Sequence, residues 1–191
     1  MRIGLYGGSF DPVHTGHVLV AQAAREEVQL DRIFFIPAAQ SPFKPGRILS
    51  PELIRLKMLR LASAGLTYCE VDPQELSRGG VSYSIDTVRD YVQRFSGAEL
   101  FYLIGADHVA QLPKWRDASE LAKRVTFLVI PRPGEGTIQA EPPFNVKHLV
   151  GFQIGVSASQ IRERVRQKLP VDLLVGAPVA ETIRHNDLYL S

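Results

Sequence analysis

Short, almost wholly apolar runs recur along the chain, and longer stretches with helical spacing separate them. The runs are rich in Ile, Leu, Val, Phe and Tyr and occupy residues 2–7, 32–37, 67–71, 100–105 and 125–131. Strands that are apolar on both sides are typical of a parallel sheet whose two faces are covered by helices. We therefore expect an α/β fold with a doubly wound, Rossmann-like parallel sheet and helices on both faces.

The segments between these runs carry the helices. Apolar residues at helical spacing predict helices over 16–29, 51–64, 84–95 and 158–168. Residues 131–144 are rich in Pro and Gly, which predicts a surface loop, and residues 148–154 form a last β-like stretch. Because 191 residues fit one domain of ordinary size, we expect residues 1–191 to form a single domain.

The composition excludes several classes of protein. With 45% hydrophobic and 22% charged residues, the chain is typical of globular proteins. A net charge of +2 offers little of the excess that non-specific nucleic-acid binders use, so we expect no nucleic-acid partner. We also expect a cytoplasmic protein with no membrane partner, because the sequence lacks a long apolar run and a secretory signal. Cys69 is the only cysteine, which excludes an internal disulfide.

The stretch GGSFDPVHTGH, residues 7–17, directly follows the first expected strand. In a doubly wound sheet, this turn commonly meets a phosphate at the N-terminus of the next helix. The two leading glycines would allow unusual dihedral angles and a close backbone approach. If Thr15 begins the helix, His14 and His17 project from one side of its first turn. Two imidazoles there can donate hydrogen bonds to phosphate oxygens, and the helix dipole attracts the negative charge of the phosphate.

A histidine pair could instead bind a metal ion, but zinc would need a further ligand. The remaining histidines, His108, His148 and His185, have no spacing that would supply one, so we expect no protein metal site. A glycine-rich turn is also common, and this one matches neither G-x-G-x-x-G nor the P-loop pattern. The glycine turn and His-x-Gly-His together are much more specific than either half, and they indicate phosphate chemistry.

The stretch resembles the signature of the nucleotidyltransferase superfamily with a His-x-Gly-His motif, and in particular the bacterial nicotinate mononucleotide adenylyltransferases. A second superfamily motif, Ser-x-x-x-Ile-Arg, is matched by SASQIR at residues 157–162. Its commoner start is Ser-Ser-Thr, so Ala158 and Ser159 are departures. Alone, the segment is typical of a basic amphipathic helix. Beside the first motif, it predicts a capping serine and an arginine directed toward ATP phosphates.

Three further segments resemble the parts of the family that receive the substrates. IPAAQSPFKP has Phe43 where the family usually has histidine, and it retains Lys44 as a phosphate-directed cation. SYSIDTV resembles the segment that faces the nicotinate carboxylate, with Ser84 where threonine is common. In IGADHVAQLPKWRD, the resemblance implies that Asp107 accepts hydrogen bonds from ribose and that Trp115 stacks on the pyridine ring, although a single tryptophan is also commonly a core anchor.

The resemblance implies three sets of site residues. The implied catalytic residues are His14, His17, Lys44 and Arg162. The implied ATP-binding residues are Gly7, Gly8, Ser9, Phe10, His14, His17, Gly105, Asp107, Ser157, Ile161 and Arg162. The implied residues for nicotinate mononucleotide are Ser9, Phe10, Lys44, Ser84, Trp115 and Arg116.

The reaction implied by the resemblance is adenylyl transfer from ATP to nicotinate mononucleotide, with Mg²⁺ as cofactor. It gives nicotinate adenine dinucleotide (deamido-NAD) and pyrophosphate in NAD biosynthesis. Nicotinamide mononucleotide and phosphopantetheine stay open as acceptors, and so does a nucleotide-binding regulator without turnover. A cationic Arg116 favours a carboxylate acceptor, yet it is equally typical of a solvent-facing arginine. The implied partners are the two small substrates, and the sequence leaves a homo-oligomer open.

Overall fold

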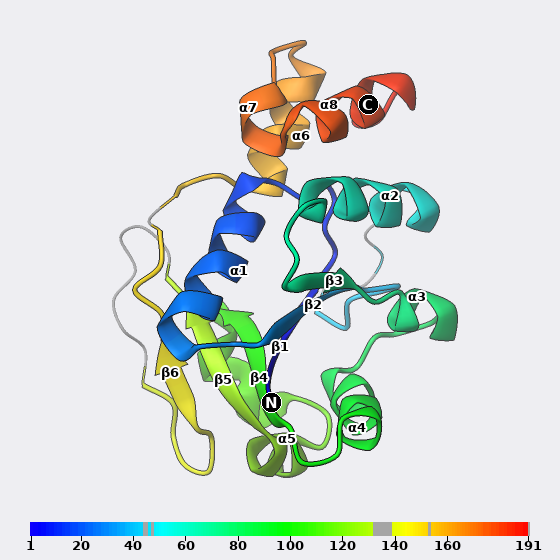
Figure 1. The fold of residues 1–191 in the computed structure, drawn as a ribbon. Coiled ribbons are helices and arrows are strands. Elements are labelled where there is room, and N and C mark those ends of the chain that lie inside the picture. The colour runs from blue at the N-terminus through cyan, green and yellow to red at the C-terminus, as the bar shows by residue number, and fades with distance from the viewer. Residues whose placement is uncertain (44–45, 47, 132–138, 153, 191) are drawn as a thin grey trace.

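The computed structural model describes residues 1–43, 46, 48–131, 139–152 and 154–190. Within these ranges, parallel strands form a six-stranded sheet in the order β3-β2-β1-β4-β5-β6 (Figure 1). The strands are β1 (Arg2–Gly8), β2 (Arg32–Pro37), β3 (Cys69–Val71), β4 (Glu99–Gly105), β5 (Val125–Ile130) and β6 (Val146–His148). The strand order reverses between β1 and β4, and ligands of doubly wound sheets bind beyond the carboxyl ends of the strands at such a point. The expected α/β class is confirmed.

Helices cover both faces of this sheet (Figure 1). In chain order they are α1 (Thr15–Val28), α2 (Glu52–Ser63), α3 (Gln74–Arg78), α4 (Ser84–Arg94), the 3₁₀ helix η1 (Ala106–Lys114), α5 (Ala118–Arg124), α6 (Ala158–Arg166), α7 (Asp172–Val175) and α8 (Ala177–His185). The last three lie together at the top of Figure 1, where α7 contacts α1 and α8 lies alongside α2. Among helices in the described ranges, none combines the length and apolar character that a membrane crossing requires.

The apolar strand sequences follow from this two-sided covering. Ile33 and Phe35 of β2 pack into the core on the side of α1 and α2. Their neighbours Phe34 and Ile36 pack into the core on the side of α4, α5 and η1. Successive side chains of a strand point to opposite faces, so the middle residues of the central strands are apolar on both sides.

The last strand differs from the expectation. The predicted stretch over 148–154 is wrong, because β6 ends at His148. Beyond it, the N–H groups of Val150 and Gly151 donate to the Glu27 carboxylate at 2.8 and 2.7 Å instead of pairing with β5. Gly151 also has a φ of 55°, which an extended strand does not allow. An acidic side chain of α1 thus ends the strand.

The third strand is shorter than expected and begins at Cys69 rather than at residue 67. The Cys69 N–H donates to the Leu66 carbonyl at 2.9 Å, so the preceding residues form a turn. The sequence patterns also missed α3, η1 and α5, which have 5, 9 and 7 residues. Elements of that length span too few turns to show a clear period.

Candidate active site

The turn that follows β1 has its unusual backbone geometry at Phe10. Gly7 and Gly8 complete β1, where they pair with β2, and neither has a positive φ, so the expected unusual dihedral angles at the glycines are wrong. Phe10 instead has a φ of 46°, although it is not glycine, and its side chain is 2% exposed. Its ring packs edge-on against Tyr6 at 5.6 Å and Phe35 at 5.7 Å. A non-glycine residue keeps such a conformation where its surroundings hold it, as at many functional sites.

Close contacts explain two of the motif's glycines. A Cβ atom on Gly16 would lie 3.0 Å from Nδ1 of His14 and 3.7 Å from the carbonyl oxygen of Val156. A Cβ atom on Gly7 would lie 2.8 Å from the hydroxyl oxygen of Tyr102. Gly16 therefore leaves room for the His14 ring, whereas the distance from this Cβ position to Val156 is an ordinary van der Waals contact.

The rings of His14 and His17 lie in contact at the start of α1, with centroids 3.7 Å apart and planes tilted by 34°. The backbone N–H of His14 donates to Nδ1 of His17 at 3.1 Å. Because an accepting ring nitrogen carries no hydrogen, the proton of a neutral His17 is on Nε2. Nδ1 of His14 is buried and has no hydrogen-bond partner among the described residues. The fold thus fixes His17 as an Nε2–H donor.

Both imidazoles are held neutral by their surroundings. Burial lowers the pKa of His14 from its ordinary 6.5 to about 4. Burial also lowers the pKa of His17 well below the ordinary value, and the neighbouring His14 lowers it further. At neutral pH each ring therefore presents one N–H donor without a positive charge.

The start of α6 meets the turn after β1. Nη1 of Arg162 donates to the backbone oxygen of Asp11 at 2.7 Å, across 151 positions of the sequence, and Nη2 donates to Oγ of Ser159 at 3.1 Å. Ser157 caps α6, because its Oγ accepts from the Gln160 N–H at 3.3 Å. The starts of α1 and α6 therefore lie close together, and the Arg162 guanidinium joins α6 to the turn that precedes α1.

Asp11 is the centre of a buried network that sequence reasoning missed. It is 3% exposed, and its carboxylate accepts from the Tyr189 hydroxyl at 2.6 Å. Tyr189 lies close to the C-terminal end of the described chain. The tyrosine thus fastens this end of the protein to the turn after β1.

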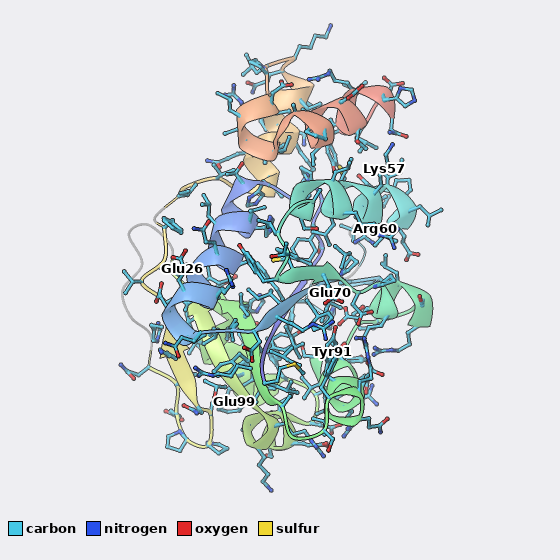
Figure 2. The ribbon with its side chains drawn as sticks, viewed as in Figure 1. Glu26, Lys57, Arg60, Glu70, Tyr91 and Glu99 are labelled. Atoms are coloured by element: carbon cyan, nitrogen blue, oxygen red, sulfur yellow. The ribbon has the colours of Figure 1, made fainter. Side chains whose placement is uncertain are left out.

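Arg55 of α2 is a second residue that sequence reasoning missed. It is 1% exposed and donates to the backbone oxygens of Ser9 at 2.8 Å, Ala38 at 2.9 Å and Ser50 at 3.1 Å. Lys57 and Arg60 of the same helix are exposed to solvent (Figure 2). The sequence could have indicated this role, because Arg55 lies on the same face of the helix as the buried leucines Leu56 and Leu59. Arg55 holds the loops after β1 and β2 together.

A cavity of about 180 Å³ lies beside the turn after β1, at the carboxyl ends of β1 and β4. Its lining brings together side chains from separate segments, among them Ser9, Phe43, Glu75, Ser84, Tyr102 and Trp115. We call it the acceptor cavity. Phe43 packs against Trp115 with a centroid distance of 5.6 Å, and Nε1 of Trp115 is buried with no hydrogen-bond partner in the described part of the chain.

The other residues implied by the resemblance have varied positions. Gly105 lines the acceptor cavity, and Asp107 follows it on η1 with an exposed side chain. Arg116 lies over the Tyr83 ring at 4.6 Å and lines a smaller hollow of about 70 Å³ next to the cavity. Lys44 lies outside the described residues.

Ile161 lies in the hydrophobic core. Its side chain is 0% exposed, and its N–H donates to the Ser157 carbonyl at 3.1 Å. Its place among the ATP-binding residues stays a prediction.

The described residues include no group of three or more His, Cys, Asp or Glu side chains that could hold a metal ion. The carboxylate of Asp11, which lies closest in sequence to the histidine pair, is engaged by Tyr189. These side chains therefore do not form a protein cage for Mg²⁺, which favours several oxygen ligands.

Known proteins resemble the chain along its whole length. Residues 5–164 match the family described as Cytidylyltransferase-like. A probable nicotinate-nucleotide adenylyltransferase of Opitutus terrae is 41% identical over 99% of this chain and 98% of its own. The nicotinate-nucleotide adenylyltransferase of Bacillus subtilis is 35% identical over 100% of this chain and 99% of its own.

Solved structures share the fold. The nicotinic acid mononucleotide adenylyltransferase of Plasmodium falciparum, complexed with NaAD, has a TM-score of 0.76 at 17% identity, over 98% of this chain and 97% of that one. The same enzyme complexed with APC has a TM-score of 0.79 at 16% identity, over 98% and 96% of the two chains. This likeness confirms the Rossmann-like nucleotidyltransferase fold.

Proposed function

The chain belongs to the cytidylyltransferase-like family and is a nicotinate-nucleotide adenylyltransferase of NAD biosynthesis. We propose that the starts of α1 and α6 bind ATP and that the acceptor cavity binds nicotinate mononucleotide. The observation that carries this proposal is the contact of Arg162 with the backbone of Asp11 at 2.7 Å. It brings a guanidinium from α6 to the turn that presents His14 and His17. Two helix N-termini, two N–H donors and one cation there suit a triphosphate.

The reaction balances as a direct displacement. The 5′-phosphate oxygen of nicotinate mononucleotide attacks the α-phosphorus of ATP in line. A P–O bond forms there, the bond from that phosphorus to the α,β-bridging oxygen breaks, and pyrophosphate leaves with the electron pair. The attacking phosphate is already anionic near neutral pH, so the chemistry needs no strong general base. The protein has to position two anions and stabilise the charge on the transferring group.

His17 has the geometry for that stabilisation. Its Nδ1 accepts from the His14 N–H, which leaves Nε2–H to donate to an α-phosphate oxygen in the transition state. His14 orients the triphosphate with its own ring N–H, and Arg162 supplies positive charge. Ser9, Phe10 and the two glycines before them would meet the phosphates through their backbone. Lys44 stays a prediction as a further phosphate-binding cation.

The acceptor cavity supplies a separate set of contacts. Trp115 offers an aromatic face for the pyridine ring, and Ser84 begins α4 at the cavity wall, where N–H groups favour a carboxylate. Arg116 adds a cation in the adjoining hollow. Asp107 is proposed for the ribose hydroxyls of the nucleotide. Together these contacts favour nicotinate over nicotinamide mononucleotide.

Mg²⁺ is proposed to enter with ATP, because the described side chains provide no cage for it. Mg²⁺ commonly binds substrate phosphates while keeping several waters, and it neutralises part of their charge. The single domain, the cytoplasmic location and the oligomeric state stay predictions.

Product analysis tests the function directly. The purified protein is incubated with ATP, Mg²⁺ and equal amounts of nicotinate mononucleotide, nicotinamide mononucleotide and phosphopantetheine, and products are identified by mass spectrometry. We expect deamido-NAD as the main product, with one pyrophosphate released per adenylyl transfer. A main product of NAD or dephospho-coenzyme A would assign another acceptor. Nucleotide binding without pyrophosphate release would identify a regulator instead.

A further inference from the structure

Glu75 of α3 is an acidic residue in the acceptor cavity to which the proposed reaction gives no part. It lines the cavity together with Tyr102 and Trp115 and is 4% exposed. Glutamate is seldom buried to this extent without a partner of opposite charge. A buried Glu75 therefore needs a group that balances its negative charge.

The partners of Glu75 within the protein are hydroxyl groups. Oγ1 of Thr87, which is itself fully buried, donates to Oε1 of Glu75 at 2.6 Å, and the Ser82 hydroxyl bonds to the same carboxyl group. Burial raises the pKa of Glu75, and these hydroxyl bonds oppose the rise. Hydroxyl donors satisfy the oxygen atoms but leave the negative charge uncompensated.

No lysine or arginine within the described ranges forms an ion pair with Glu75. Arg78 lies one turn further along α3 and acts on Glu75 only through the longer-range field. Its guanidinium donates to Gln74 at 3.1 Å and lies 4.0 Å from the Asp86 carboxylate. Asp72, the other charged neighbour, is acidic and is bound by Arg94 at 2.6 Å. The charged neighbours are thus engaged with other groups.

Aromatic rings form much of the remaining wall. The Phe43 ring lies 5.6 Å from Trp115 and 5.3 Å from His108, and Trp115 meets Tyr102 edge-on at 6.2 Å. Aromatic faces attract cations, and a buried carboxylate beside them adds a full negative charge. This combination suits a flat organic cation.

The acceptor of the proposed reaction is such a cation. The ring nitrogen of nicotinate mononucleotide is bonded to the ribose, so the ring is a pyridinium with a permanent positive charge. We propose that Glu75 is a specificity-determining residue that recognises the positive charge of the pyridinium ring, a proposal that rests on the proposed function. The carboxylate of nicotinate then lies away from Glu75, on the side where Ser84 begins α4.

Reduction of the pyridinium ring to its 1,4-dihydropyridine form removes the positive charge together with the aromaticity, so the difference between the wild-type protein and a variant that lacks the Glu75 charge isolates the contribution of charge. Isothermal titration calorimetry compares nicotinate mononucleotide with its 1,4-dihydropyridine form, whose ring is neutral, on the full-length protein. We expect the wild-type protein to bind the cationic ring about tenfold more tightly than the neutral one. In Glu75→Gln, which keeps the shape but removes the charge, we expect the two forms to bind within about twofold of each other.

Matched variants separate charge recognition from structural support. Thr87→Val removes the hydroxyl donor but keeps the charge, and Glu75→Asp keeps the charge on a shorter side chain; both should retain the preference even if overall affinity falls. Glu181→Gln makes the same charge change at an exposed position of α8 and should match the wild type. Circular dichroism checks that each variant is folded.

The outcomes distinguish this inference from the proposed function. If the wild-type protein makes deamido-NAD but binds both ring forms equally, or if folded Glu75→Gln keeps the full preference, the inference about Glu75 is wrong. If Glu75→Gln fails to fold, loss of the preference in folded Glu75→Asp would also overturn it. If the wild-type protein makes no deamido-NAD at all, the proposed function itself is wrong.

Discussion

The phosphate end of the site, where α1 and α6 begin, is built differently from the acceptor cavity beside it. At the phosphate end, the motif stretches 7–17 and 157–162 meet. A hydrogen bond from the Arg162 guanidinium to the backbone oxygen of Asp11 holds them together. The acceptor cavity borders the same turn at residues 7–9, but most of its wall comes from side chains of other segments, such as Phe43 and Trp115. Backbone contacts fix one end, whereas side-chain chemistry defines the other.

Under the proposed function, the two ends have separate tasks. A triphosphate is recognised by N–H groups and a cation, which a contiguous turn and two helix starts can supply. An acceptor ring is recognised by its shape and charge, which depend on individual side chains in the cavity. Changes at the phosphate end should therefore affect turnover, and changes in the cavity should affect the choice and binding of the acceptor.

The largest expected effect is at His17. Replacing His17 by alanine removes the Nε2–H donor, so we expect kcat to fall by about a hundredfold or more, the typical effect of losing one transition-state donor. Steady-state measurement of pyrophosphate release gives kcat, and the KM for nicotinate mononucleotide should change little. His185→Ala, at an exposed position of α8, is the matched control. A loss below about fivefold in folded protein would contradict the assignment.

The two ends also differ in how pH affects their stability. His14 has its pKa lowered to about 4, so between pH 7 and pH 5 the unfolded chain takes up a proton that the folded protein does not. The free energy of unfolding should therefore decrease as the pH is lowered from 7 to 5, and His14 should account for about 2 kcal/mol of this decrease. Glu75, whose pKa burial raises, has the opposite sign: its contribution is present at low pH and is lost as the pH rises.

Urea unfolding at pH 7 and pH 5 measures the His14 effect. We expect His14→Gln to lose about 2 kcal/mol less than the wild-type protein over this range, because glutamine does not titrate. His185→Gln should keep the wild-type pH dependence, since this histidine is exposed. Equal pH dependence in His14→Gln and the wild type would show that His14 is not held neutral by the fold.

Much of the fold could be predicted because central parallel strands are covered on both sides. β2 and β4 are apolar along almost their whole length, and this property is visible in the sequence. The end of β6 could not be predicted, because it depends on the Glu27 carboxylate of a distant helix. The short helices α3, η1 and α5 could not be predicted either, because they span too few turns to show a clear period.

The candidate site was predictable only where its residues are contiguous. His14 and His17 could be found because their spacing and the preceding turn lie in one stretch. Arg55 and Glu75 could not, because each is a charged residue whose burial comes from partners in other segments. Phe10 was expected at the site, but its positive φ was not, since a residue other than glycine seldom adopts this conformation and nothing in the sequence signals it.

The most direct test of the division between the two ends is the bisubstrate kinetics of Trp115→Ala. Trp115 also packs edge-on against Phe127 at 6.1 Å, so Trp115→Phe, which keeps a ring, serves as the control and should change each constant by less than about threefold. For Trp115→Ala we predict that the KM for nicotinate mononucleotide rises by about tenfold while the KM for ATP stays within about twofold. An equal rise in both KM values would contradict the account.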